Sequence, residues 1–447
     1  MLAEHERPPG VLDARVGDKR VREEEEEEDG GMDAARRPRI ELAAPQHAWS
    51  WRHRQDVLQE GKGTSAAQLS IVAERLLRAS GDAEVGGGVK RPRTSATSAE
   101  PLPLEWPEVL GRTRGLRNLG NTCFVNATVQ CLAHCPPLAL FLRGGQYRPT
   151  VSIPGAFDAV LALAETVQRV LGGEAVAAAP YTLVRNLRSI GRRFRPGRQE
   201  DAHEFLLLLL DAVSRTLAGT PPSPLRVHGG DRARQLKAEA DTIVYDIFGG
   251  TLRGTLRCLR CGLQSVSHER FLDLSVDIES VSSVDKALRR FTAPERLCGS
   301  NQCDCAQCGE RGDAEKQLRV ESVPNVLVLH LKRFLGVRKN SKMVSYAPTL
   351  DLQSVLVGEL GEVAAPVQNT RYRLFGVLVH EGASVHSGHY VAWVKDTNGA
   401  WLLCDDERVS QVGEASALQQ QAYVLFYLRV PAREDSHVEG SSSRNVE

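Results

Sequence analysis

The spacing of apolar residues changes once along this chain, and that change limits the fold more than any other feature. Between residues 116 and 214 apolar residues recur every three or four positions, as in amphipathic helices, most clearly over 157–171 and 200–213. From about residue 243 the pattern becomes short runs of β-branched and aromatic residues separated by turn formers, which is typical of strands. Helices followed by strands predict an α+β fold rather than an alternating parallel sheet.

The two ends of the chain have a different composition. Residues 1–108 combine an acidic block at 23–29 with stretches rich in Gly, Ala, Arg and Pro, which bury too little apolar surface to offset the entropy of ordering. We expect a largely disordered extension there, a folded domain over 109–430 and a disordered tail at 431–447.

Three short motifs stand out within the extension. Leu69, Val72, Leu76 and Leu77 share one face of a predicted helix at 66–77. Basic clusters at 36–39 and 90–93 have the composition of nuclear-import signals, although such short clusters are also common by chance.

Charge and cysteine content narrow the class of protein. Lys plus Arg and Asp plus Glu both number 56, so no global field attracts nucleic acid or an anionic membrane. Ten cysteines, several spaced as CxxC, favour a reducing compartment and metal-binding or catalytic thiols. The N-terminus is charged where a signal peptide is apolar, and FLLLLL at 205–210 is far shorter than the ~18 residues of a membrane span. We expect a soluble protein of the cytoplasm or nucleus.

One cysteine lies where a reactive thiol is expected. The stretch GLRNLGNTCFVNATVQCLAHC, residues 115–135, takes Cys123 from a loop rich in Gly and Asn into an apolar helix that Pro136 and Pro137 end. Unpaired N–H groups and the positive end of the helix dipole favour a thiolate in that first turn, and with the Asn118 amide they could stabilise an oxyanion. The alternative is a buried, inert cysteine.

Two CxxCG motifs predict a metal site. Cys258 and Cys261 form one pair and Cys305 and Cys308 the other; two intervening residues let both sulfurs of a pair face one ion, and the following glycine can turn the chain around it. Four thiolates are typical of a closed, tetrahedral, structural zinc site. The insertion between the pairs is longer than in usual zinc ribbons, and Cys298 and Cys303 lie close enough to leave the choice of ligands open.

A cysteine nucleophile needs a base, and His389 in SGHYVAW is the best candidate among the twelve histidines. It follows a Ser-Gly turn and opens a predicted strand, whereas His380 and His386 are more simply read as ordinary structural or surface histidines. Asp405 and Asp406 end the next predicted strand, AWLLCDD. An antiparallel hairpin would bring Asp405 beside His389, where a carboxylate fixes the imidazole tautomer.

At this point the sequence resembles a known family, the ubiquitin-specific proteases, over about residues 111–429. The resemblance rests on several blocks in family order: GLRNLGNTCFVN, GRQEDAHEFL, LHLKRF, YRLFGVLVHEG, SGHYVAW, WLLCDDERV and AYVLFYL. It implies a papain-like fold with a helical thumb, a β-rich palm and zinc-bearing β fingers. It also implies a cysteine peptidase that cleaves after the terminal glycine of ubiquitin on conjugated proteins.

The resemblance assigns roles to individual residues. It implies Cys123 as nucleophile, Asn118 as the oxyanion-hole amide, His389 and Asp405 as the rest of the triad, and Asp201 and Glu204 near the cationic tail of ubiquitin. Asp201 and Glu204, with Glu200, are also explained by a helix dipole, because we expect all three in the first turn of a helix. The same resemblance implies one structural zinc ion, not a catalytic one, held by Cys258, Cys261, Cys305 and Cys308.

Several alternatives and departures stay open. Cys404 stands where the family usually has an aromatic residue and could add redox sensitivity beside Asp405, and Val125 replaces the commoner Met or Leu. Asp406 rather than Asp405 could support the oxyanion or water. A catalytically silent ubiquitin-binding scaffold, or a protease for a ubiquitin-like modifier, would keep most of these motifs. We expect ubiquitin and its conjugates as partners, a monomeric catalytic domain, and no binding to membranes or directly to nucleic acid.

Overall fold

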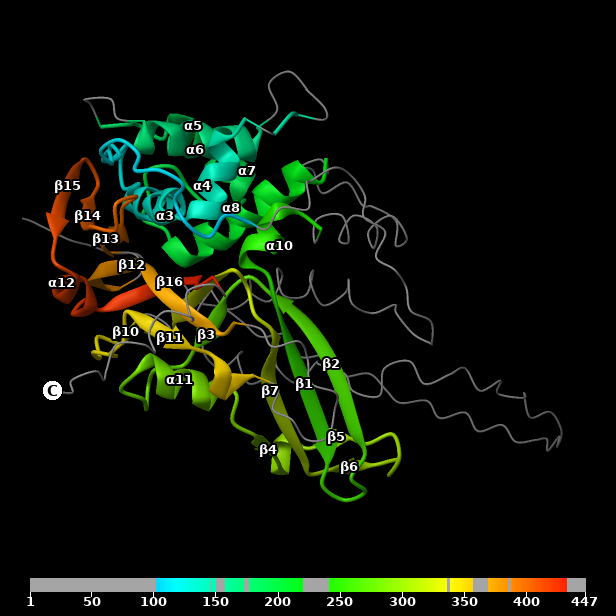
Figure 1. Ribbon diagram of the computed structural model, residues 1–447. Helices are drawn as coiled ribbons and strands as arrows, with labels where there is room; N and C mark the ends of the chain where they lie inside the picture. Colours follow the sequence, from blue (N-terminus) through cyan, green and yellow to red (C-terminus); the bar gives the residue numbers. More distant parts are fainter. Residues whose placement is uncertain are drawn as a thin grey trace, which may run out of the picture. The chain divides into compact units, whose positions relative to one another are not determined.

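The computed structural model (Figure 1) describes residues 102–145, 147–149, 157–172, 177–219, 241–335, 338–356, 369–384 and 387–431. The predicted helix at 66–77, both basic clusters and residues 432–447 lie outside the described residues. Leu102, Leu104 and Trp106 pack against the main core, so packing begins before the boundary expected near residue 108.

Helices dominate the first half of the described chain, as the apolar spacing predicts. They are α3 (Cys123–Ala133), α4 (Pro136–Arg143), α5 (Ala159–Leu171), α6 (Tyr181–Arg185), α7 (Leu187–Ile190), α8 (Ala202–Leu217) and α10 (Ile243–Phe248). We call α3 to α8 the thumb. Pro136 and Pro137 occupy the first turn of α4, where a missing N–H is harmless, and α4 leaves α3 at 90°.

A large sheet, which we call the palm, follows the helices. Its strand order is β15 (Arg408–Val412), β14 (Trp401–Asp405), β13 (Ser387–Lys395), β12 (Arg371–Ser384), β16 (Ala422–Arg429), β8 (Val326–Leu331) and β3 (Leu274–Val276), with β11 (Thr349–Asp351) also on β12. All pairs are antiparallel except β3 with β8. The predicted α+β fold is confirmed.

A second sheet carries the cysteine motifs. Its order is β2 (Gln264–Phe271), β1 (Gly250–Cys258), β7 (Ala314–Ser322) and β4 (Glu295–Leu297), and the hairpin of β5 (Cys303–Asp304) and β6 (Arg311–Gly312) lies near one end of these strands (Figure 1). We call this sheet and hairpin the fingers. The remaining elements of the described residues are α11 (Val284–Phe291), α12 (Glu414–Leu418), the 3₁₀ turns η2 (Gly299–Asn301) and η3 (Gln353–Val355), and the pair β9 (Phe334–Leu335) and β10 (Arg338–Lys339).

Alternation along the palm strands creates two cores. Tyr390 and Phe426 face the thumb core, whereas their neighbours Val391 and Leu425 face a second core on the other side of the sheet. All eleven residues of α3 are buried, and α3 packs on β13. This packing fixes the first residue of α3 against the strand that carries His389.

Among the described residues, no single helix is long and apolar enough to cross a membrane; α3 and α4, bent at their junction, meet that test only as a pair.

Candidate active site and four-cysteine cluster

Cys123 is the first residue of α3, and the loop before it is held by its own side chains. Gly120 (φ 97°) and Asn121 (φ 55°) adopt left-handed conformations. Asn118 Oδ1 accepts hydrogen bonds from the N–H groups of Gly120 and Thr122, both at 3.1 Å. The thiol residue is 2% exposed and lies beside the free N–H groups of the first helical turn, as predicted.

His389 on β13 lies between the thiol and a carboxylate. Its Nε2 is 2.7 Å from Asp405 Oδ1 at the end of β14, and its ring also hydrogen-bonds Cys123. These contacts raise the pKa of His389 to about 9. The hydrogen bond with Cys123 raises it most, and the hydrogen bond with Asp405 is the next largest cause of the increase. The hairpin expected from the sequence therefore brings Cys123, His389 and Asp405 together.

Asp406, left open by the sequence, connects the same strand end to the cysteine loop. It adopts a left-handed conformation (φ 48°), and its two carboxylate oxygens accept from Asn118 Nδ2 at 2.8 Å and Asn126 Nδ2 at 2.7 Å. Asp406 thus orients the amide of Asn118. Sequence reasoning missed Asn126, although a buried polar residue one turn after Cys123 on an otherwise apolar helix was a usable signal.

Gly115 makes this approach possible. A Cβ there would lie 2.2 Å from the carbonyl oxygen of Glu407 and 2.6 Å from that of Asp406. The next residue, Leu116, donates its N–H to the Asp406 carbonyl at 2.7 Å. The segment before the cysteine loop and the turn after β14 therefore touch through their backbones, which holds both halves of the site in register.

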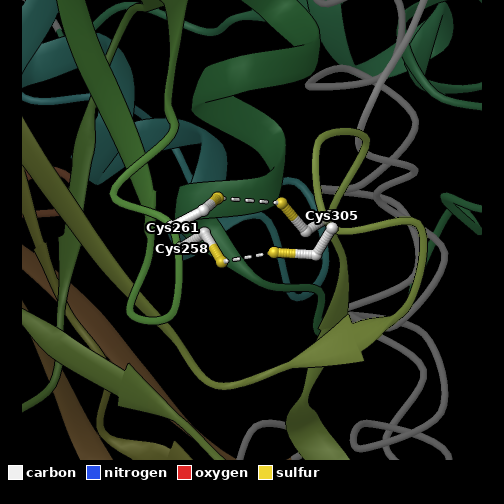
Figure 2. Close-up of side chains that lie close together, drawn as sticks. Cys258, Cys261 and Cys305 are labelled. Atoms are coloured by element: carbon white, nitrogen blue, oxygen red, sulfur yellow. Dashed lines mark hydrogen bonds between the residues drawn. The ribbon is translucent and has the colours of Figure 1, made fainter.

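The four predicted cysteines form one cluster in the fingers (Figure 2). The sulfur of Cys258 is 3.9 Å from that of Cys308, and the sulfur of Cys261 is 3.6 Å from that of Cys305; all four lie within 4.8 Å of one another. These distances are too long for disulfides, but they match the edges of a tetrahedron of thiolates around zinc, roughly 3.8 Å for Zn–S bonds of about 2.3 Å. The cluster could hold a metal ion.

The backbone of each cysteine pair is shaped for a shared ligand. Gly262 (φ 76°) and Gly309 (φ 72°) turn the chain and donate their N–H groups to the carbonyls of Cys258 and Cys305. Backbone hydrogen bonds, first from Cys261 and then from Arg260, lower the pKa of Cys258 to about 6 and so favour its thiolate. Cys303 lies on β5 and Cys298 is exposed, and neither belongs to the cluster.

Comparison with known proteins identifies the family. Residues 114–427 match the model of the family described as ubiquitin carboxyl-terminal hydrolase. The chain belongs to this family.

Curated members of the ubiquitin carboxyl-terminal hydrolase family match most of the chain. Hydrolase 42 of Homo sapiens is 35% identical over 350 residues, covering 78% of this chain and 25% of that protein. Hydrolase 23 of Arabidopsis thaliana is 40% identical, covering 70% and 35%, and 17-like protein B of Mus musculus is 38% identical, covering 73% and 66%. The match thus spans only a quarter to about a third of the first two relatives.

A solved structure of the SAGA Ubp8/Sgf11/Sus1/Sgf73 DUB module bound to ubiquitin aldehyde has a similar fold. The TM-score is 0.59 at 26% identity, covering 71% of this chain and 70% of that one. The papain-like α+β fold expected from the sequence is therefore that of this chain.

Asp201 and Glu204 lie at the start of α8 in this family member, but in different settings. Asp201 is the N-cap: its Oδ1 accepts from the N–H groups of His203 (2.8 Å) and Glu204 (3.0 Å), and its Oδ2 accepts from the Tyr423 hydroxyl at 2.6 Å. Only Glu204 lies in the first turn, since Glu200 precedes the helix. Burial, Asp201 and Glu200 raise the pKa of Glu204 to about 7.

Two other residues singled out in the sequence lie inside the protein. Cys404 is 2% exposed in the thumb core, and burial raises its pKa, so the redox sensitivity considered for it does not fit its environment. His380 on β12 is 1% exposed and packs on Phe334 and Tyr390, whereas His386 lies outside the described residues. Burial lowers the pKa of His380 to about 4, so it stays neutral.

Proposed function

We propose that this chain is a thiol-dependent deubiquitinase that hydrolyses the bond after the C-terminal glycine of ubiquitin on protein conjugates. The observation that carries the proposal is the position of His389 between the Cys123 thiol and the Asp405 carboxylate, at the N-terminus of a buried helix. Cys123 is the nucleophile, His389 the base and acid, and Asp405 the group that orients His389. The presence of all three argues against a catalytically silent scaffold.

The chemistry is acyl transfer in two steps. The Cys123 thiolate attacks the carbonyl carbon of the terminal glycine, and His389 gives its proton to the departing lysine amine. A thioester remains on Cys123, and water activated by His389 hydrolyses it. The Asn118 amide and the N–H groups at the start of α3 stabilise the oxyanion of each tetrahedral intermediate. Asp406 keeps Asn118 in place, since it accepts from the same Nδ2.

The other assigned residues serve binding and stability. Glu204, with Asp201 beside it, presents negative charge to the cationic ubiquitin tail, although the Asp201 carboxylate is largely committed to capping α8 and to Tyr423. Cys258, Cys261, Cys305 and Cys308 would hold one zinc ion with a structural role. One copy of the chain is sufficient for catalysis because every catalytic group comes from it.

The decisive experiment uses ubiquitin carrying a C-terminal electrophile, with matched probes of ubiquitin-like modifiers. We expect the ubiquitin probe to form one adduct, mapped to Cys123 by mass spectrometry, and Cys123→Ala to form none. Cys298→Ala is the control, because Cys298 is exposed but lies outside the site. An adduct on another cysteine would contradict the assignment, and a preference for another modifier's probe would reassign the substrate.

A further inference from the structure

Gln199 connects the thumb to the palm beside the catalytic histidine. Its Nε2 donates to the carbonyl oxygen of Gly388 at 2.5 Å, and its Oε1 accepts from the Gly388 N–H at 2.9 Å. Gln199 lies in the loop before α8, whereas Gly388 is on β13 and directly precedes His389. Gln199 belongs to the GRQEDAHEFL block named in the sequence analysis, but no role was assigned to it there.

At Gly388, β13 is not in regular register with either neighbouring strand. Strand β14 pairs with β13 only from Ala392 onward. On the other edge, the pairing of β12 with β13 is irregular between Glu381 and Ser384, opposite Gly388. Within the described residues, no strand register therefore includes Gly388, and the Gln199 carboxamide is the group bonded to it.

The carboxamide of Gln199 imitates a peptide group. It offers one N–H donor beside one carbonyl acceptor, and it meets both main-chain groups of Gly388 as an added strand would. A peptide that binds in extended form uses main-chain hydrogen bonds of this kind for its affinity. Gly388 directly precedes His389, whose ring hydrogen-bonds Cys123, so its main-chain groups lie on the strand that carries the catalytic histidine.

The imidazole ring of buried His380 also lies against Gly388. A Cβ at position 388 would lie 2.4 Å from His380 Nε2, so the ring lies directly against Gly388. Within the described residues, neither ring nitrogen of this buried histidine has a hydrogen-bond partner. The ring is 1% exposed and blocks the side of Gly388 that it packs against, so a ligand approaches the main-chain groups of Gly388 from the Gln199 side.

We propose that Gln199 is a clasp: in the free protein it occupies the main-chain hydrogen bonds of Gly388, and the extended C-terminal tail of ubiquitin displaces it on binding. The inference rests on the function proposed above. Gln199 thereby lowers affinity for every ligand and favours one whose backbone can replace both hydrogen bonds, which makes it a specificity-determining residue.

The test measures ubiquitin binding without turnover, in the Cys123→Ala background. Gln199→Met keeps the length of the side chain and removes both hydrogen bonds, and Gln199→Ala is the second variant. Each should bind ubiquitin about threefold to thirtyfold more tightly, the range expected for one or two net hydrogen bonds. Arg198→Ala, an exposed neighbour in the same loop, should leave the dissociation constant unchanged.

The active enzyme provides the second readout. With Cys123 intact, both Gln199 variants should lower KM for a ubiquitin fluorogenic substrate while kcat stays within about twofold, since the clasp opposes binding and takes no part in bond cleavage. Unchanged or weaker ubiquitin binding, or a fall in kcat at constant KM, would overturn the clasp and make Gln199 a support for His389. If the Cys123→Ala parent fails to bind ubiquitin and the wild-type protein fails to cleave it, the proposed function fails and the clasp falls with it.

Discussion

The protein has two cysteine sites that are built in opposite ways. In the fingers, each CxxCG motif carries its own turn: Gly262 and Gly309 fold the chain back within five residues, and the two motifs need only to meet. In the active site a single cysteine depends on groups from two palm strands far along the chain. A local motif therefore specifies the cluster, whereas the packing of α3 on β13 specifies the active site.

The same contrast holds for the electrostatics of the two sites. Backbone N–H groups within the first CxxCG motif lower the pKa of Cys258. The pKa of His389 is raised by Cys123 on α3 and by Asp405 on β14, which are tertiary neighbours. We therefore expect disruption of folding contacts to change the chemistry of the active site, and metal removal to change mainly stability.

The largest expected effect is on turnover. Cys123→Ala should lower cleavage of a ubiquitin conjugate by on the order of 10⁶-fold, since it removes the atom that attacks, and should leave the melting temperature and ubiquitin affinity close to those of wild type. Kinetics on a fluorogenic ubiquitin substrate and calorimetric binding give the two readouts. Full residual turnover would exclude Cys123 as nucleophile.

The next largest effect distinguishes the role of Asp405 from that of Asp406 through the pH dependence of activity. Because the pKa of His389 is about 9, kcat/KM should fall as the pH rises through 9, when the imidazolium that protonates the leaving amine is lost. Asp405→Asn removes a contact that raises this pKa, so the alkaline limb should move to lower pH and activity should fall by about 10² to 10⁴. Asp406→Asn should lower activity through Asn118 with a smaller shift of that limb. Equal shifts would make the two carboxylates equivalent.

Disrupting the four-cysteine cluster tests the site that a local motif specifies. Cys305→Ser should lower the melting temperature by several degrees, given about 2–4 °C per kcal/mol for domains of 150–250 residues, and should lower activity only indirectly. Prolonged chelation should do the same. Cys303→Ser is the matched control, because Cys303 is close in sequence but outside the cluster. Unchanged melting after verified metal removal would contradict a structural metal.

Gly115, which carries no catalytic group, should produce a smaller change through its backbone contact alone. Gly115→Ala puts a methyl group 2.2 Å from the Glu407 carbonyl, so we expect a loss of about 1–3 kcal/mol of stability as the turn that carries Asp406 moves away. Activity should fall about tenfold, because part of that free energy is lost from the interactions that position Asn118. Gly413→Ala, where a Cβ meets no atom within 4 Å, is the control. Wild-type kinetics in Gly115→Ala would show that this backbone contact is dispensable.

The sequence predicts some features of this protein better than others, and the difference between the two sites explains why. Periodicity predicts α3, α8 and the palm strands, because burial on one face leaves a pattern in the sequence. The CxxCG spacing predicts all four members of the cluster. Gln199, Asn126 and the role of Asp406 are different, since each depends on a contact between segments that only the packed fold brings together. The sequence contains these residues, but it does not show which residues they contact.

The smallest expected effect concerns Glu204, whose charge is set by burial and by neighbours. Its raised pKa, about 7, means that the carboxylate is increasingly neutral as the pH falls below 7 and fully charged well above it. A cationic ubiquitin tail should therefore bind more weakly at pH 6 than at pH 8, by about threefold to tenfold, as for a partly exposed ion pair. Glu204→Gln should remove this part of the pH dependence and leave the part due to His389. Titration calorimetry at both pH values, in the Cys123→Ala background, measures the difference, and an equal pH dependence in both proteins would exclude Glu204 from the tail site.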